Sequence, residues 1–162
     1  MSELQPKGSG GQEPGGVDMS RKPKKAVLVK ETFEDVRGQI AKLEMAGVKV
    51  NLLFSKAMSV RSGDWHICRQ YDLVLSGEVE IQHGTYERSR FKVLRPGELF
   101  VLPPRTPHLF RFQKDTVMLE WWDGPFRAWY YKPYRKEVEK CLRRGGKFVQ
   151  LAGLDNLVKG DA

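Results

Sequence analysis

Two short segments of this sequence concentrate side chains that can bind a metal ion or move a proton. The first covers residues 64–70 and has such a side chain at every second position: Asp64, His66, Cys68 and Gln70. The second covers residues 97–108, a glycine, a short apolar run and a proline-rich turn that ends in His108. Because side chains two residues apart on a strand share a face, the first segment presents four polar or thiol groups to one side.

Four such groups are costly to bury unless they have partners. One carboxylate and two imidazoles form the ligand set of open Fe(II) sites, and the set also suits Mn(II) or Zn(II). We therefore predict a divalent-metal site made by Asp64, His66 and His108. Gln70 would add a weak oxygen ligand or a hydrogen-bond donor, and its neutral amide lowers the charge of the ligand set.

Two alternatives to a metal-binding lumen stay open. In the opposite register the polar side chains face solvent, and Trp65 and Ile67 supply the core. A polar lumen can also exist without a metal. If the polar groups do face a lumen, the apolar outer face needs a cover, which a helix at 32–46 or a second subunit would supply.

Two further residues are candidates for contacting a substrate in such a lumen. The Arg61 guanidinium can bind an anionic group through paired hydrogen bonds. Cys68 is the second candidate, as a thiolate or a redox-active residue, although a lone buried cysteine is more often an inert small apolar side chain.

The rest of the pattern indicates the elements that hold these residues. Residues 32–46 have a capping Thr32, apolar residues at helical spacing and a terminal Gly47, which predict a helix. Alternating or short apolar runs broken by Gly and Pro then predict strands at 48–54, 64–75, 78–82, 90–94, 99–102, 108–112 and 117–122. Residues 134–144 predict a second helix. Many short strands at regular spacing favour an all-β antiparallel barrel or jelly roll.

Length and composition bound the organisation. The chain has 162 residues, of which 40% are hydrophobic, enough for one core. We predict a folded domain at 30–146, between a disordered basic tail at 1–29, rich in Gly, Pro, Ser and Lys, and a C-terminal tail at 147–162.

The net charge of +8 is unevenly distributed. Residues 31–126 carry thirteen basic and thirteen acidic residues, so the excess lies in the two end segments. A nucleic-acid reader more often carries its charge on the folded face, so nucleic acid is not expected as the primary partner.

The sequence has two cysteines, in unrelated contexts, and no apolar run long enough to cross a bilayer. These features favour a reducing, cytoplasmic compartment and no membrane partner. The basic run at 21–25, Arg-Lys-Pro-Lys-Lys, resembles a nuclear-import signal, which leaves the nucleus as the alternative.

The two segments resemble the two motifs of the cupin superfamily. In the second motif, Gly97, Pro103 and His108 hold the glycine, proline and histidine positions. In the first, with Gly77 as the last glycine, His66 holds the second histidine position. Asp64 replaces the first histidine and Gln70 the glutamate. The resemblance implies a jelly-roll barrel that binds a small molecule in its lumen and forms homodimers.

Within that superfamily, residues 97–108 and the later Asp-Gly-Pro-Phe-Arg at 123–127 look like 3-hydroxyanthranilate 3,4-dioxygenases. This likeness implies an Fe(II) dioxygenase, although Asp64 and Gln70 replace two of that family's ligands. A second class is a metal-free sugar-nucleotide isomerase or epimerase, with His66 or His108 as the acid or base. A third is a non-catalytic ligand-binding or dimerisation module.

Overall fold

The computed structural model describes residues 27–144 of the chain. These residues form eleven strands, a single 3₁₀ turn at Tyr86–Arg88 and one α-helix. The elements are β1 (Val27–Asp35), β2 (Gly38–Met45), β3 (Val48–Ser55), β4 (Val60–His66), β5 (Gln70–Ser76), β6 (Val79–His83), β7 (Arg90–Leu94), β8 (Leu99–Leu102), β9 (His108–Phe112), β10 (Thr116–Trp122), β11 (Ala128–Tyr130) and α1 (Lys132–Arg144).

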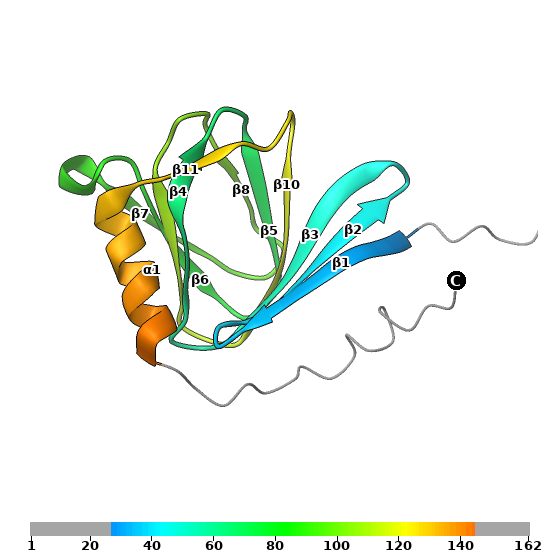
Figure 1. Cartoon of the computed structure of the whole chain (residues 1–162), viewed down its shortest axis with the longest axis horizontal. Helices are drawn as coiled ribbons and strands as arrows, with labels where there is room; N and C mark the ends of the chain where they lie inside the picture. Colours follow the sequence, from blue (N-terminus) through cyan, green and yellow to red (C-terminus); the bar gives the residue numbers. More distant parts are fainter. Residues whose placement is uncertain (1–26, 145–162) are drawn as a thin grey trace, which may run out of the picture.

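Two antiparallel sheets face each other and enclose the barrel (Figure 1). One sheet has six strands in the order β1-β2-β3-β10-β5-β8, and the other has five in the order β11-β4-β9-β6-β7. Figure 1 shows β1, β2 and part of β3 extending beyond the barrel. We call β1 and β2 the wing. The predicted all-β jelly roll with a C-terminal helix is therefore confirmed.

The predicted N-terminal helix at 32–46 is wrong, because these residues form most of the wing hairpin. After β2, Ala46 and Gly47 both have positive φ, at 48° and 83°. They join β2 to β3 with the two-residue loop that suits the twist of paired strands. At the other end Gly38 has φ 124°, and an added Cβ would lie 2.0 Å from the Phe54 carbonyl oxygen. Of the apolar residues whose spacing indicated a helix, Val36 lies in the turn before β2, Ile40 packs against the main core and Leu43 lies on the opposite face of β2.

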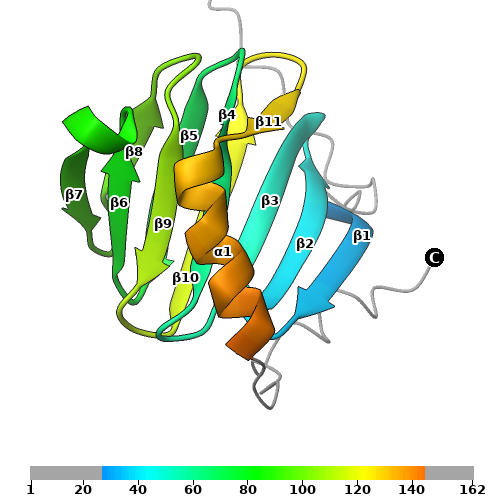
Figure 2. The same cartoon turned by 60° about the vertical axis from the view of Figure 1, so that its left-hand side comes forward.

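The helix α1 packs against the outer face of the five-stranded sheet (Figure 2). Its buried Tyr134 and Val138 lie on Leu109 of β9. The Tyr134 hydroxyl also donates to the Gly84 carbonyl at 2.8 Å, which ties the helix to the loop after β6. The second predicted helix, at 134–144, is thus present and begins two residues earlier.

The main core lies between the two sheets and is made of side chains from both. Its fully apolar members are Leu53, Val74, Val79, Ile81, Leu94, Leu102, Phe110, Phe112 and Met118. The inward rows of β5, β9 and β10 are apolar at one end of the barrel and polar at the other, where Gln70, His108 and Glu120 stand. The apolar end stabilises the fold, and the polar end is where a binding site can form.

The predicted domain boundaries differ from the structure at the start. The first strand begins at Val27, three residues inside the segment expected as a tail. The remainder of that tail, with the basic run at 21–25, and the segment 147–162 lie outside the described residues. Within residues 27–144 no helix is long and apolar enough to cross a membrane.

Candidate metal centre

A bulge in β4 aims the first two site residues into the barrel. The pairing of β4 with β9 shifts register between Ser62 and Asp64, and Ser62 and Gly63 have φ values of 69° and 79°. Arg61 and Asp64 are three residues apart, so a regular strand would place them on opposite faces. The extra residue of the bulge turns both inward.

Gly63 also allows α1 to approach the bulge. An added Cβ would lie 3.1 Å from the backbone of Arg135 and from the Val138 side chain. The Gly63 carbonyl accepts a hydrogen bond from the Tyr131 amide at 2.9 Å. The helix therefore supports the strand from behind where the site residues leave it.

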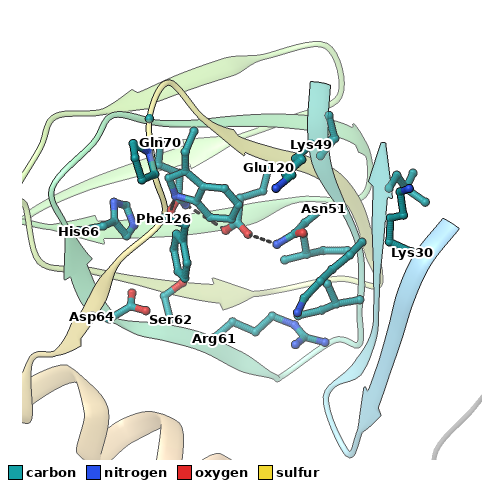
Figure 3. A pocket seen from close by; sticks show the side chains of 18 of the residues that line it. Lys30, Lys49, Asn51, Arg61, Ser62, Asp64, His66, Gln70, Glu120 and Phe126 are labelled. Carbon is teal, nitrogen blue, oxygen red and sulfur yellow. Dashed lines mark hydrogen bonds between the residues drawn. The ribbon is translucent and has the colours of Figure 1, made fainter. Parts of the chain in front are cut away.

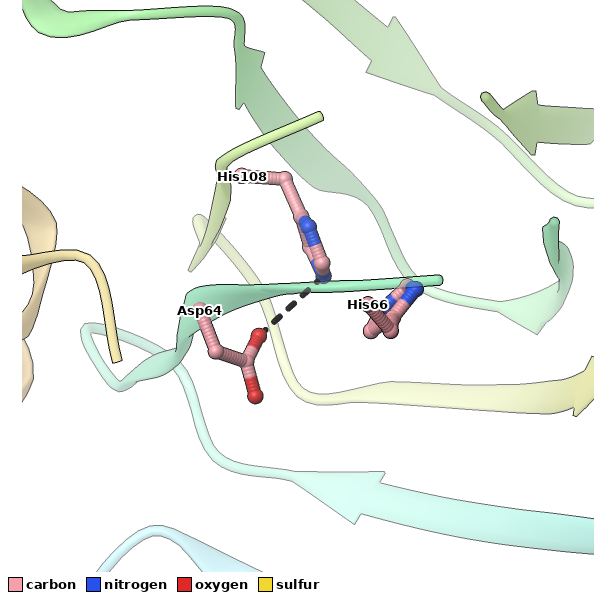
Figure 4. Close-up of side chains that lie close together, drawn as sticks. All are labelled: Asp64, His66 and His108. Carbon is pink, nitrogen blue, oxygen red and sulfur yellow. Dashed lines mark ion pairs between the residues drawn. The ribbon is translucent and has the colours of Figure 1, made fainter. Parts of the chain in front are cut away.

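Asp64, His66 and His108 meet inside the barrel (Figure 4). Their potential ligand atoms all lie within 4.8 Å of one another. Asp64 and His108 are direct partners across the β4–β9 pair, and an Asp64 carboxylate oxygen lies 3.4 Å from His108 Nε2. His66 is 2% exposed and His108 0%. The polar side chains thus face the lumen rather than solvent.

Both imidazoles present an unpartnered nitrogen to the centre. His108 Nδ1 lies 3.1 Å from the Thr106 carbonyl oxygen, and His66 Nδ1 lies 3.4 Å from that of Cys68. A carbonyl oxygen only accepts, so Nδ1 is the protonated nitrogen of each neutral ring. Each Nε2 then carries a lone pair, and both Nε2 atoms are buried without a hydrogen-bond partner.

Burial keeps these rings neutral and makes Asp64 hard to ionise. It lowers the pKa of His108 to about 4. The pKa of His66 is also lowered, first by burial and then by His108. Burial raises the pKa of Asp64. With neutral rings, the Asp64 carboxylate and the His108 lone pair are two acceptors facing each other at 3.4 Å, an arrangement that a cation or a shared proton would relieve.

Gln70 is held by a buried polar network on the opposite wall. Its amide donates to Asp72 at 2.9 Å and to Glu120 at 3.1 Å, and its carbonyl oxygen accepts from the Trp122 indole at 3.1 Å. Asn51 donates to the other Glu120 oxygen at 3.2 Å. In this arrangement Gln70 serves as a donor between two carboxyl groups.

Sequence reasoning missed Asp72 and Glu120. Burial, and then Glu120, raise the pKa of Asp72 well above its ordinary value. Burial also raises the pKa of Glu120 to about 7. For Glu120 the sequence holds a signal. It is the single acidic residue of an apolar strand, and because it stands two residues from Met118 and from Trp122, it lies on the same side of the strand as they do.

The expected single strand through 64–75 is instead two strands in different sheets. β4 ends at His66, residues 67–69 turn, and β5 begins at Gln70 in the facing sheet. Cys68 therefore lies in a turn, with its sulfur 3.8 Å from the Pro125 carbonyl oxygen. It is absent from the lining of the pocket beside the metal centre. Its pKa is raised by burial, which keeps the thiol protonated.

A pocket of about 1060 Å³ opens beside the centre (Figure 3). Asp64 and His66 lie at its inner end, and the wing forms its outer wall. Phe126, from the loop after β10, lies 5.8 Å from the His66 ring and 4.5 Å from the Trp122 ring, between centroids. Aromatic rings therefore shield the inner end from solvent.

Arg61 lines the same pocket and is 3% exposed. Its Nε donates to the Ser55 hydroxyl at 2.8 Å, and one terminal nitrogen lies 3.4 Å from the Phe54 carbonyl oxygen. Burial, and then Arg37, lower its pKa to about 10, so it stays charged at neutral pH. Within residues 27–144 it forms no ion pair with a carboxylate.

No family model matches the sequence, and no curated protein matches it. Solved structures match it in fold. A variant of oxalate decarboxylase from Bacillus subtilis aligns with a TM-score of 0.56 at 13% sequence identity, over 68% of this chain and 33% of that chain. The capsular polysaccharide assembling protein CapF from Staphylococcus aureus aligns with a TM-score of 0.53 at 18% identity, over 69% of this chain and 33% of that chain.

The chain thus spans about a third of the length of either neighbour. The alignments show that it has the cupin fold, as the sequence motifs predicted. At these identities they show the fold alone.

Proposed function

We propose that this cupin-fold protein holds a divalent cation, Fe(II), Mn(II) or Zn(II), on Asp64, His66 and His108. With it the protein would act on an anionic small molecule in the adjoining pocket, as a dioxygenase-like metal-dependent enzyme. The observation that carries the proposal is the convergence of two buried, unpartnered imidazole nitrogens and a carboxylate.

The residues present fit such an ion. Ligand atoms that share one ion at about 2.0–2.2 Å lie about 3–4 Å apart. The Asp64–His108 separation of 3.4 Å falls in that range, and the whole group, within 4.8 Å, would close slightly around an ion. Carbonyl partners on both Nδ1 atoms hold the rings in the orientation that metal-bound histidines adopt. The bound ion would supply Lewis-acid or oxygen-dependent chemistry.

The chain's own residues have distinct roles beside that ion. Arg61 would bind the anionic group of the substrate. Among the described residues its buried guanidinium has no carboxylate partner, which is costly unless an anion completes it. Phe126 and Trp122 would exclude water from the inner end of the pocket. Glu120 lines the pocket and, with a pKa of about 7, could give or take a proton near neutral pH.

Metal content of protein purified without a tag or a chelator tests the proposal. We expect about one Fe, Mn or Zn per chain, and its loss in His108→Ala. His83→Ala is the matched control for a neighbouring histidine that is not a ligand: His83 pairs with His108 across β6 and β9 but lies outside the group. Absence of metal even after incubation with excess Fe(II), Mn(II) or Zn(II) would reject the metal reading.

A metal-free isomerase or epimerase acting on nucleotide sugars is the second candidate. It is favoured by the raised pKa of Asp64 and its 3.4 Å approach to His108, since a proton shared by this pair could serve as an acid or base. Metal-free wild-type protein that binds UDP-glucose in calorimetry would support it over the first proposal. A non-catalytic binding module would tolerate loss of both histidines without loss of ligand affinity.

Cys68 and Cys141 are both free, which supports a reducing compartment.

A further inference from the structure

A second arginine, Arg135, reaches the pocket from the first turn of α1. The helix packs so closely on the β4 bulge that an added Cβ at Gly63 would lie 3.1 Å from the Arg135 backbone. The Arg135 side chain lines the same pocket as Arg61, which leaves β4 three residues before Asp64. The function proposed above gives Arg61 a ligand and leaves Arg135 without a role.

The Tyr130 ring holds the Arg135 guanidinium near the metal centre. Tyr130 is the direct partner of Asp64 across the β11–β4 pair, so both side chains lie on the pocket side of the sheet. The guanidinium carbon of Arg135 lies 4.0 Å from the centroid of the Tyr130 ring, in a cation–π contact. The ring face attracts the positive charge but provides no lone pair for the N–H donors.

The hydrogen-bonding capacity of Arg135 is incompletely used. Its Nε is buried and has no hydrogen-bond partner. Its ion pair is with Glu139, one turn along α1, whose carboxylate oxygen lies 3.7 Å from that Nε, too far for a hydrogen bond. The Glu139 side chain is 50% exposed, so this pair contributes little. Because a guanidinium has five N–H donors and no acceptor, an anion in the pocket is the partner that suits Arg135.

We propose that Arg135 is a second anion-binding residue of the pocket, and that the substrate is an elongated dianion with one anionic group at Arg61 and the other at Arg135. The proposal rests on the proposed function, from which it takes the anion at Arg61. Three residues of strand separate Arg61 from Asp64, about 10 Å at the rise of a regular strand and less across a bulge.

The directions of the two side chains agree with an elongated ligand. Figure 3 shows the Arg61 side chain pointing away from Asp64, toward the wing. Arg135 lies on the other side, over the partner of Asp64. The two anionic groups are therefore on the order of 10 Å apart, and the group at Arg135 is the one nearer the metal centre.

Calorimetry tests the proposal on the full chain stripped of metal on a chelating resin, with carboxylates as probes. Succinate, adipate and suberate are dicarboxylates of increasing length, and butyrate, hexanoate and octanoate are the monocarboxylates of the same lengths. We expect the best dicarboxylate to bind about tenfold more tightly than its monocarboxylate, because it engages both arginines. Arg135→Met should remove this preference and leave the monocarboxylate affinity, which Arg61 supplies, nearly unchanged.

Lys136→Met is the matched control, since it removes the same charge from the next residue of α1, which is exposed and outside the pocket lining. It should keep the preference. Arg135→Lys keeps the charge but loses the planar fork, so it should keep only part of the preference. Because Arg135 packs on Tyr130, Arg135→Gln is a second variant that keeps part of the side-chain stem, and circular dichroism checks that each variant is folded.

Wild-type protein that binds mono- and dicarboxylates of one length equally would overturn the proposal. So would a preference that Arg135→Met and Arg135→Gln retain, or one that Lys136→Met also loses. Arg135 lies outside the group of Asp64, His66 and His108, so its variants should keep the metal content of the wild type. The metal measurement and the dicarboxylate measurement can therefore fail separately.

Discussion

At one end of the barrel Phe110, Met118 and their apolar neighbours fill the space between the sheets, and at the other end the strands carry His108, Glu120 and Gln70, of which Glu120 and Gln70 line the pocket. The apolar end gains free energy from burial. The polar end keeps two unpartnered imidazole nitrogens, an arginine that has no ion pair within residues 27–144, and two carboxyl groups with raised pKa values. One end of the barrel stabilises the fold, and the other keeps groups that are costly to bury because a ligand would use them.

Phe110→Ala should have the largest effect on the free energy of unfolding. Phe110 is 0% exposed in the main core, and truncating such a ring costs about 3–5 kcal/mol of unfolding free energy. Urea unfolding followed by circular dichroism measures the loss. Metal affinity of the folded variant should fall less than in His108→Ala, because Phe110 packs on the His108 ring, at 5.4 Å between centroids, but offers no ligand atom. A loss below about 1 kcal/mol would show that the apolar end is not what stabilises the barrel.

His108→Ala should have the opposite profile. We expect metal affinity to fall by about 100-fold or more, because the variant lacks one ligand of three. The unfolding free energy without metal should fall less than in Phe110→Ala, because the variant loses the Nδ1 hydrogen bond to Thr106 and ring packing but also removes the unpartnered Nε2 that faces Asp64. Isothermal calorimetry with Zn(II) and urea unfolding in a chelator measure the two effects. Equal metal affinity in wild type and variant would contradict the assignment of His108 as a ligand.

Glu120→Gln should change how stability depends on pH. Burial raises the pKa of Glu120 in the folded chain to about 7, from 4.5. The folded state therefore holds the proton more tightly, and this group's contribution to stability is present below pH 4.5 and is lost as the pH rises through 7. The variant lacks that loss, so its stability relative to wild type should increase between pH 5 and pH 8, by on the order of 2 kcal/mol. Urea unfolding at both pH values measures it, and a constant difference would contradict a protonated Glu120.

Arg61→Met should have the smallest effect, confined to anion binding. We expect the metal-free protein to bind inorganic phosphate about tenfold more weakly in the variant, because the unpaired guanidinium is removed. Arg69→Met is the control, since the Arg69 side chain is 60% exposed and the pocket lining does not include it. Equal weakening in both variants would point to general charge attraction rather than to a site.

The fold could be predicted from the sequence, from its strand pattern and from the spacing of Gly97, Pro103 and His108. It also brought out His66 and His108, because histidines are rare in this chain and both fall at motif positions. It could not reveal the β4 bulge, since two residues with positive φ at Ser62 and Gly63 have no marker beyond one glycine. That bulge, rather than simple alternation, places Arg61 beside Asp64.

The wing and the carboxyl network were missed for different reasons. Helical spacing is satisfied by Val36, Ile40 and Leu43. What requires a hairpin instead is the close approach of Gly38 to the Phe54 backbone on the neighbouring strand β3, which a helix could not make. Burial raises the pKa of Glu120. Its hydrogen-bond partners in that buried position, Asn51 and Gln70, are distant from it in sequence. No local pattern shows that burial.

From Gln70 to Val74 in β5, and from Met118 to Trp122 in β10, the pairing is regular and leaves no spare position for an inserted or deleted residue. In β5, Gln70, Asp72 and Val74 face inward while Tyr71, Leu73 and Leu75 face outward. A one-residue slip would exchange the two sets, which would move the Asp72 carboxylate to the outward side of the sheet and a tyrosine to the inward side. Insertions and deletions should therefore be tolerated in the loops. In these two strands only substitutions should be tolerated, and each substitution alters the side chains of one face of the sheet.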